Sequence, residues 1–152
     1  MKITPAKAVL KTPLYFIQGI SMEPFLSEGM IVEIDYDLTA QCGDVVVFYR
    51  GNDLIGHRVV HIKEQPSVTY EIKGDALGYS DGWLARSSII GVATRLTIAG
   101  KTYSLNAPSV RFIHRLIVRY TYRKTRGYSM FIRLLATAYR VVLWMNASSS
   151  DH

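Results

Sequence analysis

The first two thirds of the chain alternates short apolar, β-branched runs with turn-forming residues. The runs occupy residues 30–36, 44–49, 54–62, 68–72 and 89–98, with Gly, Asn, Asp and Pro between them. Runs of this length are typical of strands, and no helical period separates them. The pattern therefore predicts a mainly β fold, a small antiparallel or mixed barrel-like sheet, with a hairpin tip at residues 51–53.

The pattern changes at Pro108. Residues 110–124 contain no glycine or proline, and a second helical run follows over residues 129–145. Basic residues recur every four positions along the first run and would form one stripe on a helix: Arg111, Arg115, Arg119 and Arg123. We therefore predict a β-rich domain over residues 1–108, a basic amphipathic helical extension over 109–146 and a flexible tail over 147–152.

The charge of the chain is concentrated in this extension. The net charge is +6, yet residues 1–108 carry ten Lys/Arg against eleven Asp/Glu, and residues 109–152 carry eight against one. Such asymmetry indicates an anionic partner for residues 109–146. We favour an anionic membrane surface. Packing on the body or on a second copy is the alternative, and nucleic acid is the least favoured partner.

Four short motifs in the first half carry the candidate chemistry. They are Gly19–Pro24 (GISMEP), Gly43–Phe48 (GDVVVF), Gly56–Val60 (GHRVV), and Lys73–Asp75 (KGD) with Asp81 six residues later. Together they supply a serine, a histidine and an acid, which are the groups needed for acyl transfer through an activated hydroxyl.

In order and spacing, these motifs resemble those of type I signal peptidases and their relatives. The first is similar to the nucleophile box, the second to a structural strand, the third to the general-base box and the fourth to the box that holds the acid. His57 stands where bacterial signal peptidases and the LexA and UmuD autopeptidases place a lysine, as in the endoplasmic-reticulum and archaeal type. The resemblance implies a small antiparallel β catalytic domain and a serine endopeptidase that cleaves a leader or signal-like peptide after small residues.

The resemblance assigns a role to each candidate residue. Ser21 would be the nucleophile and His57 the base, because neutral imidazole can take a hydroxyl proton near pH 7. Asp81 would orient the imidazole, with Asp75 as the reserve candidate for this acid. The Ser21 backbone N–H is the expected oxyanion donor, and Gly19 stands where some relatives have a second donor.

Neither a cofactor nor a metal is expected. On a regular strand His57 and His61 would share one face about 13 Å apart, too far to bind one ion together. We expect His61 and His114 to be packing or solvent-facing residues.

Two departures from the family keep alternatives open: Gly19 at the position of the second oxyanion donor, and the missing membrane anchor. Residues 1–20 show neither the usual membrane anchor nor a signal peptide, so we expect a cytoplasmic protein, peripheral at the inner face of the membrane. One alternative is a LexA-like self-cleaving regulatory module, for which Ala136–Ala138 offers a small-x-small site. The other is a catalytically inactive β module tethered to a membrane.

Overall fold

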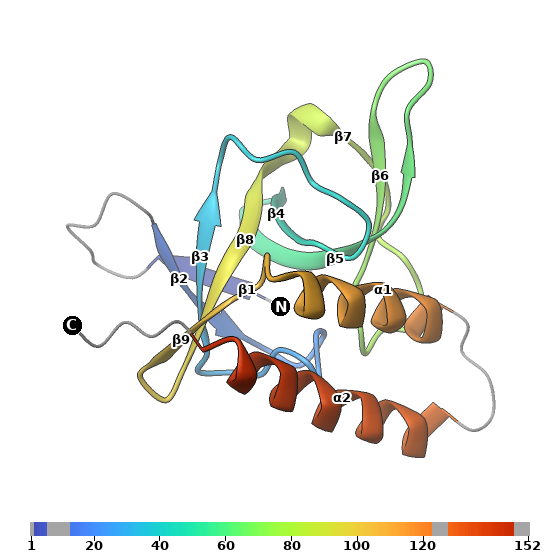
Figure 1. Ribbon diagram of the computed structural model, residues 1–152. Helices are drawn as coiled ribbons and strands as arrows, with labels where there is room; N and C mark the ends of the chain where they lie inside the picture. The colour runs from blue at the N-terminus through green and yellow to red at the C-terminus, as the bar shows by residue number, and fades with distance from the viewer. Residues whose placement is uncertain (1, 6–12, 123–127, 148–152) are drawn as a thin grey trace.

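The computed structural model describes residues 2–5, 13–122 and 128–147, and side chains within 13–122 and 130–147. In these parts of the chain two α-helices follow nine strands (Figure 1), and a short 3-10 helix, η1 Arg86–Ser88, lies between β7 and β8. The strands are β1 Lys2–Pro5, β2 Leu14–Gln18, β3 Ile31–Asp35, β4 Val45–Arg50, β5 Asp53–Lys63, β6 Thr69–Lys73, β7 Gly82–Ala85, β8 Ile89–Ile98 and β9 Lys101–Ser104. The helices are α1 Pro108–Tyr122 and α2 Tyr128–Met145. The prediction of a mainly β fold with a helical extension is confirmed.

The sheet closes on itself. Its order is β1-β2-β3-β8-β4-β5-β6-β7, with β9 on β8, and every pairing among the described strands is antiparallel. A further pairing of β1 with β5, at Lys2 and Ile55, joins the first strand of this order to the sixth. The result is a barrel-like body from which β6 and β7 extend. The expected hairpin tip is also present, since Arg50 pairs with Asp53.

One expectation about β5 was wrong. Regular alternation would put His57 and His61 on the same face of the strand. The pairing with β6 slips by one residue between Val59 and His61, which is a β-bulge, and an extra residue inverts every side chain beyond it. His57 is therefore buried, whereas His61 is exposed, with its Nδ1 2.8 Å from Glu71 Oε2.

The two helices lie side by side against the sheet (Figure 1) and share its hydrophobic core. Each buries residues spaced three and four apart, the pattern of a helix with one face on a core. The buried set is Val110, Ile113, His114, Ile117 and Thr121 on α1, and Ile132, Leu135, Ala136, Tyr139 and Leu143 on α2. Arg115, Arg119, Arg133 and Arg140 are exposed.

Two earlier expectations concern the end of the chain. Arg123 of the basic stripe lies outside the described residues. So do residues 148–152 of the expected flexible tail, whereas Ala147 forms a β-bridge with Tyr103. Neither α1 nor α2, the helices of the described part, has the length and apolar character needed to cross a membrane.

Candidate active site

The candidate nucleophile, Ser21, lies in the loop between β2 and β3. Three apolar side chains that follow it, Met22, Phe25 and Leu26, are buried in the core shared by the sheet and the helices. The backbone of the loop is held as well, because the Ala76 N–H donates to the Ser21 carbonyl at 2.9 Å. The hydroxyl is thus carried by a well-packed loop while Ser21 itself stays partly exposed.

The candidate base, His57, lies in the middle of β5, where it pairs with Val46 of β4. Its ring is buried and meets the Phe48 ring edge-on, with centroids 6.3 Å apart. Its Nε2 lies 2.8 Å from Ser21 Oγ. This is the hydrogen-bond reach that a general base needs to take a hydroxyl proton.

The candidate acid, Asp81, comes directly before β7, and its N–H donates to the Ile72 carbonyl at 2.7 Å. One carboxylate oxygen, Oδ2, is hydrogen-bonded to His57 Nδ1. A carboxylate partner favours the tautomer with the proton on Nδ1, which leaves the Nε2 lone pair facing Ser21 Oγ. Ser21, His57 and Asp81 therefore form one continuous hydrogen-bonded chain across 60 sequence positions.

Arg50, which sequence reasoning missed, also binds Asp81. It ends β4, next to the hairpin tip, and its guanidinium contacts Asp81 Oδ1. Each oxygen of the Asp81 carboxylate thus has its own partner, His57 on one and Arg50 on the other. The sequence does not indicate this role for an arginine at an exposed strand end. The contact depends on where the fold places the loop before β7.

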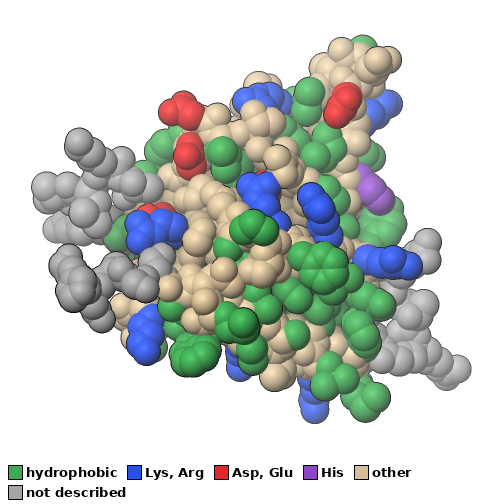
Figure 2. Space-filling view, in the orientation of Figure 1, with side chains coloured by type: hydrophobic (Ala, Val, Ile, Leu, Met, Phe, Trp, Pro, Cys, Tyr) green, Lys and Arg blue, Asp and Glu red, His purple; other side chains and the backbone are tan. Residues whose placement is uncertain are grey.

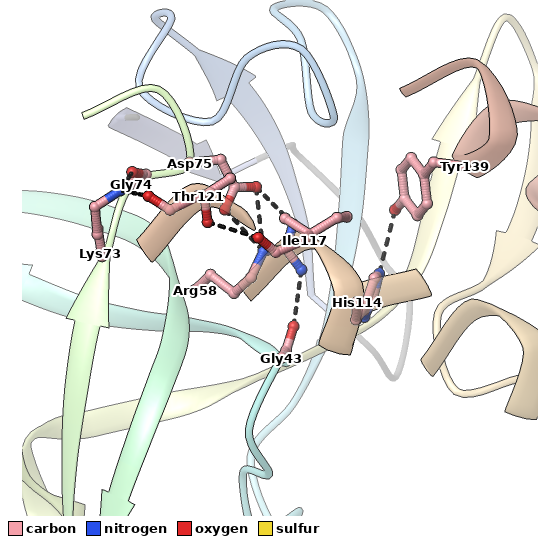
Figure 3. A network of polar contacts seen from close by, with 9 residues as sticks. All are labelled: Gly43, Arg58, Lys73, Gly74, Asp75, His114, Ile117, Thr121 and Tyr139. Atoms are coloured by element: carbon pink, nitrogen blue, oxygen red, sulfur yellow. Dashed lines mark hydrogen bonds and ion pairs between the residues drawn. The ribbon is translucent and has the colours of Figure 1, made fainter. Parts of the chain in front are cut away.

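Asp75, the reserve acid, is bound elsewhere. It forms a buried, two-pronged ion pair with Arg58, whose Nη2 is 2.6 Å and Nε 2.8 Å from the carboxylate oxygens. Arg58 Nη1 also donates to the Gly43 carbonyl at 2.8 Å, and Figure 3 shows this network behind α1. Burial alone would lower the pKa of Arg58, but the facing Asp75 carboxylate raises it above its ordinary value. In the structure His57 is therefore paired with Asp81, whereas Asp75 is paired with Arg58.

The two motif residues before Asp75 also make structural contacts. Lys73 Nζ donates to the Thr121 carbonyl at 3.0 Å, which ties the end of β6 to the last turn of α1. Gly74 allows the chain to pass very close to the nucleophile loop, because a Cβ there would lie 2.8 Å from the Ser21 carbonyl oxygen. The Lys-Gly-Asp motif is therefore a structural link between α1, the ion pair and Ser21.

His114 belongs to the same buried layer. Its Nε2 lies 3.5 Å from the Tyr139 hydroxyl, and its Nδ1 is buried with no hydrogen-bond partner in the described structure. Burial, followed by the charges of Arg58 and Arg111, holds its pKa well below the ordinary value. Of the two roles expected for His114, packing and solvent-facing, the structure shows packing.

Neither a protein-family model nor a curated protein matches this sequence. Membership of the signal peptidase superfamily therefore stays a prediction from the four motifs. Within the described residues, no group of three or more His, Cys, Asp and Glu is placed to hold a metal ion.

Proposed function

We propose that this chain is a serine endopeptidase with a Ser-His-Asp mechanism, similar to the histidine-type signal peptidases. The observation that carries the proposal is the Ser21–His57–Asp81 chain, with Ser21 Oγ 2.8 Å from His57 Nε2 and the Asp81 carboxylate on the other ring nitrogen. Such an arrangement activates a hydroxyl whose proton would otherwise be held too tightly at neutral pH.

The proposed reaction proceeds in two halves. His57 Nε2 takes the Ser21 proton while Oγ forms a bond to the scissile carbonyl carbon, and the Asp81 carboxylate stabilises the imidazolium. The imidazolium then returns the proton to the leaving amine as the C–N bond breaks, which leaves an acyl ester on Ser21. His57 then takes a proton from water while the water oxygen bonds to the ester carbon. The imidazolium returns this proton to Ser21 Oγ as the ester C–O bond breaks, which releases the acid product and free Ser21. The Ser21 N–H remains the proposed oxyanion donor.

The substrate class follows from the motif resemblance. It is an extended leader or signal-like peptide with small residues before the cleaved bond. An extended peptide can pair with a strand through its main chain, and alternate side chains then point into the site. A small-residue preference would reflect limited space beside Ser21.

The self-cleaving alternative receives no support at the small-x-small site. Ala136–Ala138 lies inside α2, and Ala136 is buried against the body. A peptidase of this kind acts on extended backbone, so cleavage there would first require α2 to unfold. We therefore favour a separate peptide as substrate.

The proposed location is cytoplasmic and peripheral at the inner face of the membrane. The support is electrostatic: residues 108–145 contain eight Lys/Arg and no Asp/Glu, and the cytoplasmic leaflet carries anionic lipids that attract such segments.

A peptide library with product analysis by mass spectrometry tests the proposed activity. We expect cleavage after small residues by the wild-type protein and none by Ser21→Ala or His57→Ala. Arg95→Gln, an exposed change on β8, is the matched control and should retain full activity. Cleavage by Ser21→Ala at the wild-type rate would refute the proposal.

A further inference from the structure

Helix α2 has two apolar stripes on opposite sides. The inner stripe packs on the body through residues including Leu135 and Tyr139. The outer stripe is Met130, Leu134, Val141 and Met145, each between 51% and 73% exposed. At 100° per residue these four positions lie within about 60° of one another and opposite the buried set. A surface helix of a globular protein needs only the inner stripe, so the outer one requires another explanation.

A row of cationic and aromatic side chains borders the outer stripe. Arg133, Arg140 and Trp144 follow one another seven and four positions apart, which places them along one flank of the stripe. All three are exposed. Figure 2 shows hydrophobic side chains gathered over the region of α1 and α2, with Lys and Arg among them. Helices that lie in a membrane interface have this composition: an apolar stripe, arginines beside it and tryptophan at the boundary.

We propose that the outer stripe of α2 is a docking surface for an anionic phospholipid bilayer, on which the helix lies flat without crossing. In this position Met130, Leu134, Val141 and Met145 would enter the acyl boundary, and Arg133 and Arg140 would meet the phosphates. Because the helix would lie flat, both arginines can reach the phosphates although they stand near the middle of α2.

Charge decides between a membrane and a second copy of the chain. Neither α1 nor α2 contains an acidic residue. In a two-fold dimer through this face, Arg133 and Arg140 would lie against α2 of the other copy, which offers no carboxylate to pair with them. An anionic lipid surface neutralises the row instead.

Docking through α2 would also fix the orientation of the body. The inner stripe of the same helix supports the loop that carries Ser21, since the Phe25 and Tyr139 rings meet edge-on with centroids 5.9 Å apart. The catalytic loop would therefore be held at a constant orientation to the bilayer. The docking proposal does not rest on peptidase activity, and it applies equally to a Ser21→Ala protein.

Vesicle flotation tests the proposal with the full chain. We expect binding to vesicles of phosphatidylcholine with about 30% phosphatidylglycerol, a composition that mimics an anionic leaflet, and at least tenfold weaker binding to phosphatidylcholine alone. Leu134→Gln/Val141→Gln should lose at least tenfold in binding, and so should Arg133→Gln/Arg140→Gln. Matched controls, Tyr49→Gln/Trp83→Gln for exposed apolar residues and Lys63→Gln/Lys101→Gln for exposed charges, should bind as the wild type does.

A second measurement needs no change in the stripe. In a Trp83→Phe protein Trp144 is the sole tryptophan, and its emission should shift to the blue when anionic vesicles are added. Unshifted emission, equal flotation of all variants, or a dimer in solution that Leu134→Gln/Val141→Gln dissolves while vesicle binding persists would overturn the proposal. Ser21→Ala should float as the wild type does. Its flotation therefore tests membrane docking independently of peptidase activity.

Discussion

Phe25, four residues after the candidate nucleophile, packs its ring edge-on against Tyr139 of α2. The contact joins two segments that the sequence assigns to different parts of the protein, the β body and the helical extension. Both rings are buried, and aromatic pairs of this geometry add about 0.5–1.5 kcal/mol to the burial of their area. The C-terminal helices therefore form part of the support beneath the Ser21 loop.

Gly74→Ala should impair catalysis by displacing this loop. The new Cβ would lie 2.8 Å from the Ser21 carbonyl oxygen and 2.9 Å from Leu77 Cδ1, and relief requires the Ser21 backbone to move. Misplacement of this kind lowers kcat by on the order of 100-fold. Steady-state peptide cleavage measures it.

Gly100→Ala is the matched control for that variant. Gly100 has a φ of +79°, so alanine is strained there, but nothing lies within 4 Å of the added Cβ. This variant should lose stability and keep kcat. Equal kcat values for Gly74→Ala and the wild type would show that the close approach to Ser21 has no catalytic importance.

Arg50→Gln should lower the rate of peptide cleavage. The arginine binds one oxygen of the Asp81 carboxylate, and the other oxygen contacts His57. Without Arg50 the Asp81 carboxylate is positioned less firmly against His57, so kcat should fall by about tenfold. Steady-state peptide cleavage measures the change.

Arg50→Lys retains the charge without the planar fork. It should recover part of kcat. If Arg50→Gln gave the wild-type kcat, Arg50 would be a surface residue without influence on the triad.

Replacement by asparagine should affect stability at Asp75 and catalysis at Asp81. Asp75→Asn breaks a buried ion pair with Arg58, which is fully inaccessible, and should cost about 3–5 kcal/mol of unfolding free energy. Asp81→Asn should leave stability nearly unchanged and lower kcat by about 10⁴-fold, because the amide favours the wrong tautomer of His57. Urea unfolding and peptide cleavage, measured on both variants, check this. A stable but inactive Asp75→Asn with an active Asp81→Asn would reverse the two roles.

His114 should make the stability of the fold depend on pH. Its pKa is held well below the ordinary value of 6.5, so the unfolded chain binds a proton that the folded chain does not. Stability should therefore fall as pH drops below about 6.5, with a slope of up to about 1.4 kcal/mol per pH unit.

His114→Gln removes this titration while retaining a polar group beside Tyr139. Urea midpoints at pH 7.5 and 5.5 should differ less for this variant than for the wild type. An equal difference in both proteins would assign the pH dependence to other groups.

The local patterns of the sequence predicted much of this fold. The five expected strands are β3, β4, β5, β6 and β8, and the two expected helices are α1 and α2. Four strands were not individually predicted: β1, β2, β7 and β9. Each has only four or five residues, and strands this short depend on their pairing partners more than on their own composition.

The three triad residues could be predicted because residue type and the order of the motifs identify them. Ser21, His57 and Asp81 were chosen by residue type and motif, and the structure brings these three together. The Arg50–Asp81 contact and the Arg58–Asp75 pair were missed because each joins residues that only the folded sheet brings together. The position of His61 was misjudged because a bulge depends on the pairing of β5 with β6 and leaves no mark in the alternation of one strand.

The central claim is that Ser21 and His57 act as one unit, and a double-mutant comparison of peptide cleavage tests it most directly. Residues that share one proton transfer give non-additive losses. Ser21→Ala, His57→Ala and the double variant, all confirmed as folded by circular dichroism, should fall to the same residual rate. A double variant slower than the wild type by the product of the two single effects, or a His57→Ala protein that cleaves at the wild-type rate, would contradict the account.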